Sequence, residues 1–308
     1  MTSVPSVQGT AVDVPTEDGV ADAHLSHPAD GAPRPGVLFY QDAFGLRPHL
    51  RAMADRLAGA GYTVLVPNVF YRHGPSPVVE LPEFIDPEAR PDIFERLRPV
   101  MRSLTDDLAM RDADAYLRWL ARSPLVLDGP VAVTGYCMGA RLSLLTAGTH
   151  PERVAAAAGF HGGRLATEAP DSPHLVAGRV TAELYFGHAD DDPALPPDER
   201  ERLEAALTTA GVRHRCGVYE GAPHGFTQAD TAAYQQAASE RHWAALLDLL
   251  DTHLLTPARA TTPTPAPAQA DSGPSNDAHT GARASRTPPR APTPTRAPAP
   301  APAPAPSH

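Results

Sequence analysis

Cysteine is scarce in this sequence, with only Cys137 and Cys216 among 308 residues. A disulfide framework is therefore excluded, and each thiol has to be considered singly. Apolar runs are short, and none approaches the ~20 residues that a membrane-spanning helix needs; the first residues also lack a secretory signal pattern. Basic residues are outnumbered, with 26 Lys and Arg against 36 Asp and Glu. These absences predict a soluble, cytoplasmic protein that binds neither membranes nor nucleic acid.

Proline, in contrast, is abundant and unevenly distributed. From residue 257 onward the chain consists almost wholly of Pro, Ala, Thr, Ser and Arg, and it closes in alternating alanine and proline. Such a composition cannot bury a core and favours an extended, solvated polyproline geometry. The sequence therefore predicts a folded domain over residues 1–256 and a disordered tail over residues 257–308. The tail is expected to be inert, with a docking role as the alternative.

The first 256 residues alternate short Val- and Leu-rich runs with segments of helical periodicity, a pattern typical of α/β proteins. Strands are expected over residues 36–40, 62–66, 131–134, 154–160, 182–186 and 216–219. Helices are expected over residues 48–60, 93–121 with a break at Pro99, 140–149, 197–210 and 231–255. Residues 10–24 predict an antiparallel hairpin. The expected architecture is a mostly parallel sheet with helices on both faces.

The most informative motif follows the strand expected over residues 131–134. Gly135-Tyr136-Cys137-Met138-Gly139 separates that strand from a helical stretch. A turn of the form G-x-nucleophile-x-G needs its glycines because strand and helix pass close together while the central residue is strained. The Cys137 sulfur would then lie at a helix N-terminus, where the dipole favours a thiolate. A buried, inert cysteine is the alternative interpretation.

A nucleophile of this kind needs a base, and the base needs an acid that orients it. Acidic residues at 190–192 follow the strand expected over 182–186, and His224 follows the strand expected over 216–219. The order of nucleophile, acid and histidine is that of α/β-hydrolases.

These residues resemble the dienelactone hydrolase family, the cysteine-dependent branch of the α/β-hydrolase fold, over residues 9–255. Besides the Cys137 turn, the match rests on the segments 40–45 (Tyr-Gln-Asp-Ala-Phe-Gly), 192–196 (Asp-Pro-Ala-Leu-Pro) and 224–226 (His-Gly-Phe). The resemblance implies an α/β-hydrolase fold and an ester or lactone hydrolase similar to carboxymethylenebutenolidase. An amidase or peptidase using the same residues is an alternative, as is a non-enzymatic scaffold that works through the tail.

The resemblance also implies the role of each site residue. Cys137 would be the nucleophile, His224 the general base and Asp192 the acid, with Asp190 and then Asp191 as alternatives for the acid. The backbone N–H groups of Ala43 and Met138 would form the oxyanion hole. A thioester acyl-enzyme would form and be hydrolysed, so no metal, nucleotide or organic cofactor is expected, and the histidines show no zinc-binding spacing. The expected partner is a small-molecule ester or lactone, and the protein is expected to be a monomer.

Two departures from the family pattern concern the substrate. Asp42 stands where the family usually has a glutamate that holds the resting thiol, and the shorter side chain predicts a weaker hold. Gln228 stands where the archetype has an arginine that grips a substrate carboxylate, which predicts a neutral ester or lactone unless Arg98 or Arg102 compensates. The other candidates for the substrate pocket are Phe44, Tyr71, Arg72 and His161. Cys216 is expected to be a packed core thiol.

Overall fold

The computed structural model describes residues 6–86, 88–190 and 192–255. The tail predicted for residues 257–308 lies outside these described residues, so its disorder and the domain boundary before it stay predictions. Within the described residues, the strands form one eight-stranded sheet in the order β1-β2-β4-β3-β5-β6-β7-β8. The strands are β1 (Val7–Thr16), β2 (Gly19–Pro28), β3 (Gly36–Tyr40), β4 (Thr63–Pro67), β5 (Val131–Tyr136), β6 (Val154–Phe160), β7 (Glu183–Ala189) and β8 (His214–Tyr219).

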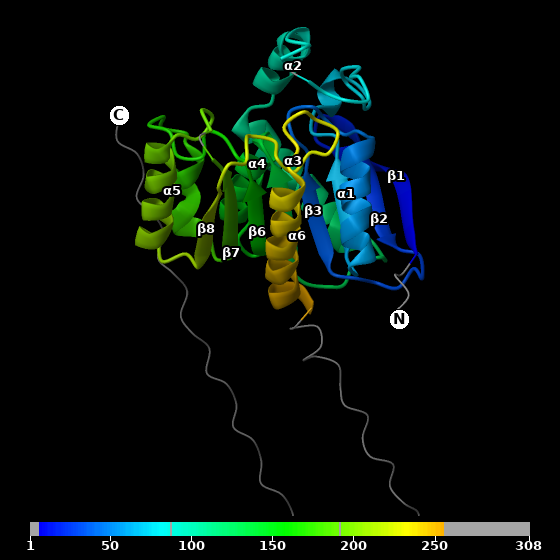
Figure 1. The fold of residues 1–308 in the computed structure, drawn as a ribbon. Helices are drawn as coiled ribbons and strands as arrows, with labels where there is room; N and C mark the ends of the chain where they lie inside the picture. Colours follow the sequence, from blue (N-terminus) through cyan, green and yellow to red (C-terminus); the bar gives the residue numbers. More distant parts are fainter. Residues whose placement is uncertain (1–5, 87, 191, 256–308) are drawn as a thin grey trace, which may run out of the picture. The chain divides into compact units, whose positions relative to one another are not determined.

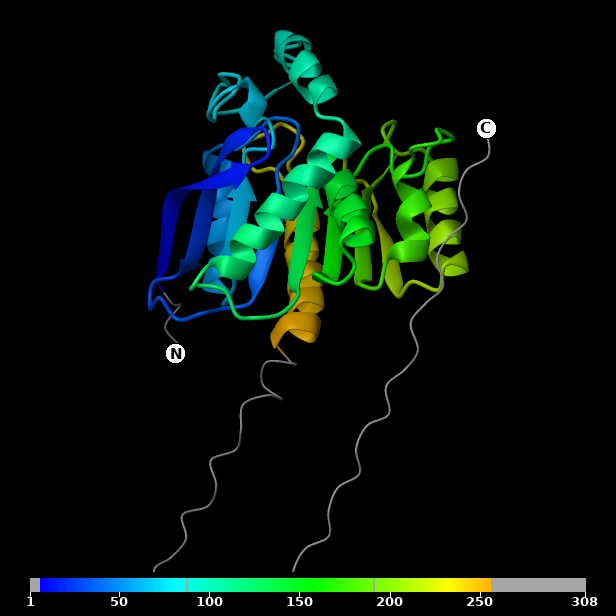
Figure 2. The same ribbon diagram turned by 180° about the vertical axis from the view of Figure 1, so that it is seen from behind.

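The sheet is mostly parallel, and helices cover both of its faces, as predicted. Only β2 runs against the direction of the other strands: it pairs antiparallel with β1, with which it forms the predicted hairpin, and with β4. The helices are α1 (Pro48–Gly59), α2 (Asp92–Ser103), α3 (Asp106–Arg122), α4 (Met138–Thr149), α5 (Pro197–Thr209) and α6 (Gln236–Leu250). Helices α1 and α6 pack on one face (Figure 1), and α3, α4 and α5 pack on the other (Figure 2).

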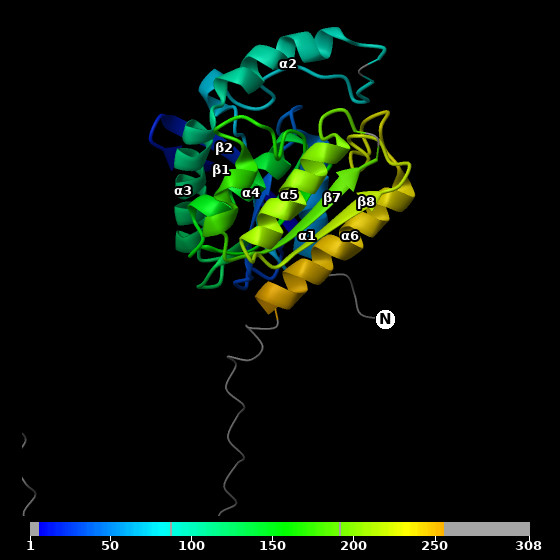
Figure 3. The ribbon, with the colours of Figure 1, turned by 90° about the vertical axis from the view of Figure 1, so that its left-hand side faces the viewer.

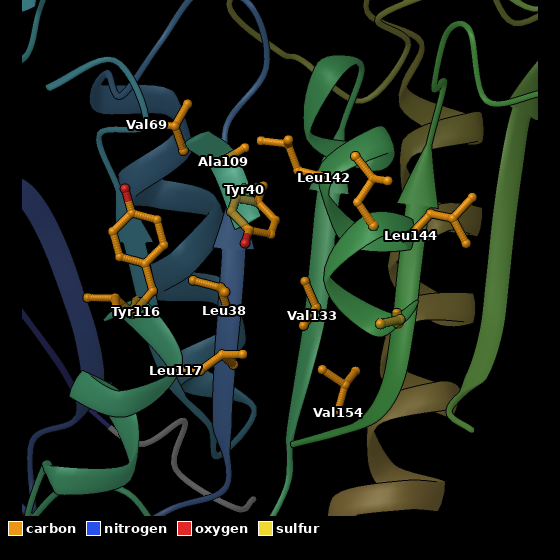
Figure 4. Packing of buried hydrophobic residues seen from close by; sticks show 14 of the residues in the cluster. Leu38, Tyr40, Val69, Ala109, Tyr116, Leu117, Val133, Leu142, Leu144 and Val154 are labelled. Atoms are coloured by element: carbon orange, nitrogen blue, oxygen red, sulfur yellow. The ribbon is translucent and has the colours of Figure 1, made fainter. Parts of the chain in front are cut away.

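The two faces of the sheet carry the two main apolar clusters. Central strands are buried on both faces, which is why β5 has a run of apolar residues rather than an alternating pattern. Figure 4 shows one of these clusters, in which Leu38 and Tyr40 of β3 face Tyr116 and Leu117 of α3. The buried Tyr40 hydroxyl hydrogen-bonds Thr146 Oγ1 at 2.9 Å, so this polar group is satisfied inside the core.

The prediction for the helical stretch 93–121 is wrong in the position of its break. The chain forms two helices there, and the break lies at residues 104–105, whereas Pro99 lies inside α2. The Thr105 side chain accepts a hydrogen bond from Leu108 N–H at 3.3 Å, and two aspartates follow in the first turn of α3. A capped new helix begins there for this reason. Pro99 is tolerated because it lies on the exposed side of α2, where water can bind the carbonyl that loses its partner.

The last predicted helix also begins later than expected. Residues 231–235 are not helical, and α6 begins at Gln236. This segment instead pairs with backbone outside the helix, because Ala232 N–H donates to Ile85 O at 3.0 Å and Gln235 N–H donates to Phe226 O at 3.1 Å. Tertiary hydrogen bonds therefore override the local helical pattern at this point.

The sheet topology brings the chemistry-bearing loops to one edge. The parallel strands β3, β5, β7 and β8 all end at the same edge, where the loops that follow them gather. Ligands bind at such an edge in open α/β sheets. Figure 3 shows α2 lying across this end of the sheet.

Candidate active site

Cys137 occupies the sharp turn between β5 and α4. Its backbone has φ 54° and ψ −114°, a left-handed conformation that is strained for a residue with a side chain. A Cβ atom added at Gly135 would lie 2.1 Å from the Gly139 carbonyl oxygen, and one at Gly139 would lie 2.6 Å from the carbonyl oxygens of Tyr40 and Gln41. Both glycines are therefore required by close backbone approach, which explains the G-x-C-x-G pattern.

His224 and Asp192 complete the group around Cys137. The Nδ1 atom of His224 lies 2.6 Å from Asp192 Oδ2, and His224 and Cys137 line the same cavities. Asp192 is buried, and its other oxygen accepts a hydrogen bond from Ala194 N–H at 2.9 Å. The structure thus brings together the three residues singled out from the sequence. With Nδ1 held by the carboxylate, Nε2 is the atom left to exchange a proton with the sulfur.

The electrostatics of the group favour a charged histidine. Burial lowers the pKa of His224, but the Cys137 sulfur and the Asp192 carboxylate outweigh that effect and raise the pKa to about 10. Burial likewise opposes ionisation of Asp192, but the hydrogen bond from His224 and its charge keep the pKa of this carboxyl below its ordinary value. The arrangement therefore favours the imidazolium form of His224.

The alternative acid Asp190 has a backbone partner in the turn after β8. Asp190 Oδ2 accepts a hydrogen bond from Gly221 N–H at 2.9 Å and so fixes the turn after β8. Asp191 lies outside the described residues.

The two expected oxyanion donors come from different elements of the fold. Met138 is the first residue of α4, so its N–H has no acceptor within the helix. Ala43 lies in the turn after β3, where Phe44 N–H donates to Asp42 Oδ1 at 2.9 Å and Gly45 N–H donates to Asp42 O at 3.2 Å. These bonds fix the turn that presents Ala43.

Asp42 and Cys137 line the same cavity, but the Asp42 carboxylate has other partners. Arg47 Nη1 and Nη2 donate to the two Asp42 oxygens at 2.7 and 3.0 Å. Arg47 also donates to Asp230 through Nε at 2.6 Å and through Nη2 at 3.0 Å, and to Gln228 Oε1 at 3.1 Å. Only 6% of Arg47 is exposed. The sequence analysis missed Arg47 and Asp230, since no motif marks either residue.

Two cavities meet at Cys137 and His224. The smaller has a volume of about 160 Å³ and an almost wholly apolar lining; its walls include Phe44, Phe94, His161 and Gln228. The larger is an open cleft of about 640 Å³, whose walls include Met138, Arg98 and Arg102. Phe94, Arg98 and Arg102 all belong to α2, the helix that lies across the site (Figure 3). Sequence reasoning missed Phe94, because the position of α2 follows only from the tertiary fold.

Two pocket candidates lie elsewhere. Tyr71 and Arg72 are not among the residues that line either cavity. Both contact the buried Asp112 of α3, from the Tyr71 hydroxyl at 3.0 Å and from Arg72 Nη1 at 2.7 Å. They join η1 (Tyr71–His73) to α3 and have a structural contact there. Cys216 packs against the core, and burial raises the pKa of its thiol to about 12, in keeping with the expected packed thiol.

His161 lies in the wall of the small cavity and is fully buried. Its ring centroid lies 5.2 Å from that of His224, with the rings edge to face. Burial and the neighbouring His224 both lower the pKa of His161 well below its ordinary value, so this ring is neutral. His161 therefore packs against His224 without competing for its proton.

Comparisons with known proteins agree with this fold. The model of the "Dienelactone hydrolase family" matches residues 21–254. A "Putative carboxymethylenebutenolidase" of Synechocystis sp. is 26% identical over 251 residues, which cover 80% of this chain and 98% of the relative. A "Probable 2-oxo-3-(5-oxofuran-2-ylidene)propanoate lactonase" of Bradyrhizobium sp. is 25% identical over 249 residues, covering 79% of this chain and 94% of the relative.

A solved structure shows the same fold. It is described as a "Putative Dienelactone Hydrolase" from Klebsiella pneumoniae, with a TM-score of 0.69 and 24% identity, and the match covers 80% of this chain and 98% of that one. The predicted α/β-hydrolase fold is confirmed by this likeness. Among the described residues, no helix is long and apolar enough to cross a membrane. The family match spans most of the chain, so this protein belongs to the dienelactone hydrolase family, and the prediction of an ester or lactone hydrolase is confirmed at the level of that family.

Proposed function

We propose that this protein hydrolyses small carboxylic esters or lactones through Cys137, His224 and Asp192, as a carboxymethylenebutenolidase does. The observation that carries the proposal is the position of His224, whose Nδ1 atom lies 2.6 Å from Asp192 and whose ring lines the same two cavities as Cys137. A strained turn holds the sulfur at the mouth of two cavities, which is how an accessible nucleophile is presented.

The first half of the reaction forms a thioester. The Cys137 thiolate attacks the carbonyl carbon, a C–S bond forms, and the carbonyl oxygen takes the negative charge beside the N–H groups of Ala43 and Met138. Collapse of this intermediate breaks the C–O bond, and the His224 imidazolium gives its proton to the departing oxygen. For a lactone the departing alcohol stays attached to the acyl group.

The second half restores the enzyme. Neutral His224 takes a proton from water, the resulting hydroxide attacks the thioester carbon, and the C–S bond breaks to release the carboxylic acid. The proton on His224 and the thiolate then form the resting pair again. Every proton in this cycle is moved by His224, so none of its steps calls for a cofactor.

The two cavities support a proposal in which two portions of the substrate bind in different places. An uncharged acyl portion fits the small cavity, because Gln228 and Phe94 offer no cation there and the lining is almost wholly apolar. The remaining portion would extend into the larger cleft towards Arg98 and Arg102. The expectation drawn from Gln228, that the substrate is neutral, therefore applies to the portion of the substrate that occupies the small cavity.

The experiment is hydrolysis of p-nitrophenyl acetate by wild type, Cys137→Ala and the matched control Cys216→Ala, whose thiol lies outside the two cavities. We expect activity in wild type and Cys216→Ala and none in Cys137→Ala. Mass spectrometry of the acid-quenched reaction should find one acetyl group on Cys137. Full activity in Cys137→Ala would refute the proposal.

The two alternative functions are tested with the same preparations. An amidase or peptidase would release p-nitroaniline from p-nitroacetanilide, whereas we expect hydrolysis of the ester with no release of p-nitroaniline. A scaffold that acts through its tail would hydrolyse neither compound. A chain ending at residue 256 should keep the full esterase rate.

A further inference from the structure

We propose that Arg47 is a positioning residue that joins the oxyanion segment to the loop of the catalytic histidine and keeps the charge of Asp42 away from Cys137. The proposal rests on the proposed function for its meaning in catalysis. Its evidence is separate, because it comes from a buried chain of hydrogen bonds in which neither Cys137 nor Asp192 takes part.

The first half of that chain fixes the oxyanion segment. Arg47 binds both oxygens of Asp42 and, at 3.3 Å, the carbonyl oxygen of Gly45. Asp42 in turn accepts the N–H of Phe44. The residue between Asp42 and Phe44 is Ala43, the expected oxyanion donor. Three contacts therefore hold the backbone on both sides of the N–H that has to meet the developing charge.

The second half of the chain reaches the histidine loop, residues 224–231. Arg47 donates to Gln228 Oε1 at 3.1 Å, and Gln228 Nε2 donates to Thr227 Oγ1 at 3.0 Å. The Thr227 hydroxyl lies 2.8 Å from His161 Nε2, and the His161 ring packs edge to face against His224. Arg47, Gln228, Thr227 and His161 are each at most 6% exposed. The chain thus links the oxyanion segment to the back of the catalytic ring through groups shielded from water.

Arg47 also sets the direction of these hydrogen bonds. A guanidinium can only donate, so Gln228 must turn its oxygen towards Arg47 and its NH₂ towards Thr227. The Thr227 hydroxyl then has its hydrogen available for His161 Nε2, 2.8 Å away. We infer that Thr227 donates this hydrogen, which places the His161 proton on Nδ1.

Charge is the second part of the inference. Asp42 is buried in the wall of the small cavity with Cys137, and an uncompensated carboxylate there would oppose a thiolate. Arg47 is paired with Asp42 and, on its far side, with Asp230, which is 17% exposed. His49 also faces this group, but burial lowers its pKa, so it adds no charge at neutral pH. The cation on Arg47 is what shields the nucleophile from Asp42.

The test compares Arg47→Gln with Arg56→Gln, a matched control on α1. Arg56 makes a similar two-bond ion pair with Glu240, at 2.9 and 2.7 Å, but lies outside both cavities. In Arg47→Gln we expect kcat for p-nitrophenyl acetate to fall about 10²-fold with a smaller change in KM, since a misplacement of about 1 Å costs that much. Arg56→Gln should keep the wild-type kcat.

Alkylation of Cys137 by iodoacetamide, followed by mass spectrometry across pH, gives a readout that a merely structural role would not move. Its midpoint should shift upward by about one pH unit in Arg47→Gln and return to the wild-type value in Asp42→Asn/Arg47→Gln, whereas kcat stays low in both. Because alkylation needs no ester turnover, this arm is informative even if the proposed function fails. An unchanged midpoint in Arg47→Gln, or wild-type kcat there, would overturn the inference.

Loss of a buried ion-pair partner can prevent folding. Arg47→Lys retains the charge but cannot make the forked contacts. In this variant we expect a wild-type alkylation midpoint and a kcat reduced at least ~10-fold. ¹⁵N NMR of His161 should show the Nδ1–H tautomer in wild type. Wild-type kcat in Arg47→Lys, or an Nε2–H tautomer of His161 in wild type, would equally contradict the role assigned to Arg47.

Discussion

Replacing Asp192 by asparagine tests how the histidine is held. The substitution preserves the shape of the side chain and the acceptor for Ala194 N–H but removes the charge that lies 2.6 Å from His224 Nδ1. A hydrogen bond to a charged group contributes about 1.5–3 kcal/mol, and one pKa unit corresponds to ~1.36 kcal/mol. The pKa of His224, about 10 with Asp192 present, should therefore fall by about one to two units.

The amide also changes the tautomer of the ring. If its NH₂ group faces Nδ1, that nitrogen must accept a hydrogen bond, and the ring proton moves to Nε2. A protonated Nε2 has no lone pair with which to take the proton of the Cys137 thiol. Such an exchange in a catalytic triad lowers kcat by as much as ~10⁴-fold. We expect a loss between about 10²- and 10⁴-fold in Asp192→Asn, measured as the initial rate of p-nitrophenyl acetate hydrolysis across pH.

The matched control is Asp190→Asn, two residues earlier in the same loop. Asp190 holds Gly221 N–H rather than the histidine, so the kcat of this variant should stay within about threefold of wild type. Equal rates in Asp192→Asn and wild type would refute the assignment of the acid. A large loss in Asp190→Asn alone would transfer that role to Asp190.

Three further predictions follow from packing and charge. Gly139→Ala should lower the free energy of unfolding by about 1–3 kcal/mol in urea titrations, since its Cβ would lie 2.6 Å from two backbone oxygens; Gly178→Ala, with no atom within 4 Å, should not. Arg98→Gln/Arg102→Gln should raise KM for 4-acetoxybenzoate about 3- to 10-fold and leave KM for phenyl acetate unchanged, because these arginines line the cleft; equal effects on both esters would contradict this. His242 is fully buried, and burial lowers its pKa to about 3. Above pH 6.5 this histidine is neutral in both the folded and the unfolded chain. Below pH 6.5 only the unfolded chain gains the proton, so the free energy of unfolding falls as the pH drops towards 3, by about 2 kcal/mol at pH 5.0. Urea unfolding at pH 7.5 and 5.0 should show a loss of stability in His242→Gln that is smaller than the loss in wild type by this amount.

Much of the site could be predicted from the sequence because its chemistry depends on local constraints. The glycines beside Cys137 are required by backbone contacts within one turn and with one neighbouring strand, so they appear as a short motif. His224 and Asp192 each follow a strand of the same parallel sheet, and parallel strands bring their ends to one edge whatever the intervening loops do. The order of motifs along the chain was therefore enough to predict that these residues meet.

Tertiary contacts decided what no local pattern records. The helix predicted to begin at residue 231 begins at Gln236, because the preceding segment is engaged by Ile85 and Phe226. Arg47 contacts Asp230 and Gln228, which lie more than 180 residues away along the chain. These long-range contacts place Arg47 at the site, although no local sequence pattern marks it. The Cys137 turn motif, the order of its partners and the class of fold follow from the amino-acid sequence, because each depends on near neighbours or on strand order. The packing of α2 over the cavities and the partners of Asp42 depend on distances between remote segments, and only the folded chain sets these.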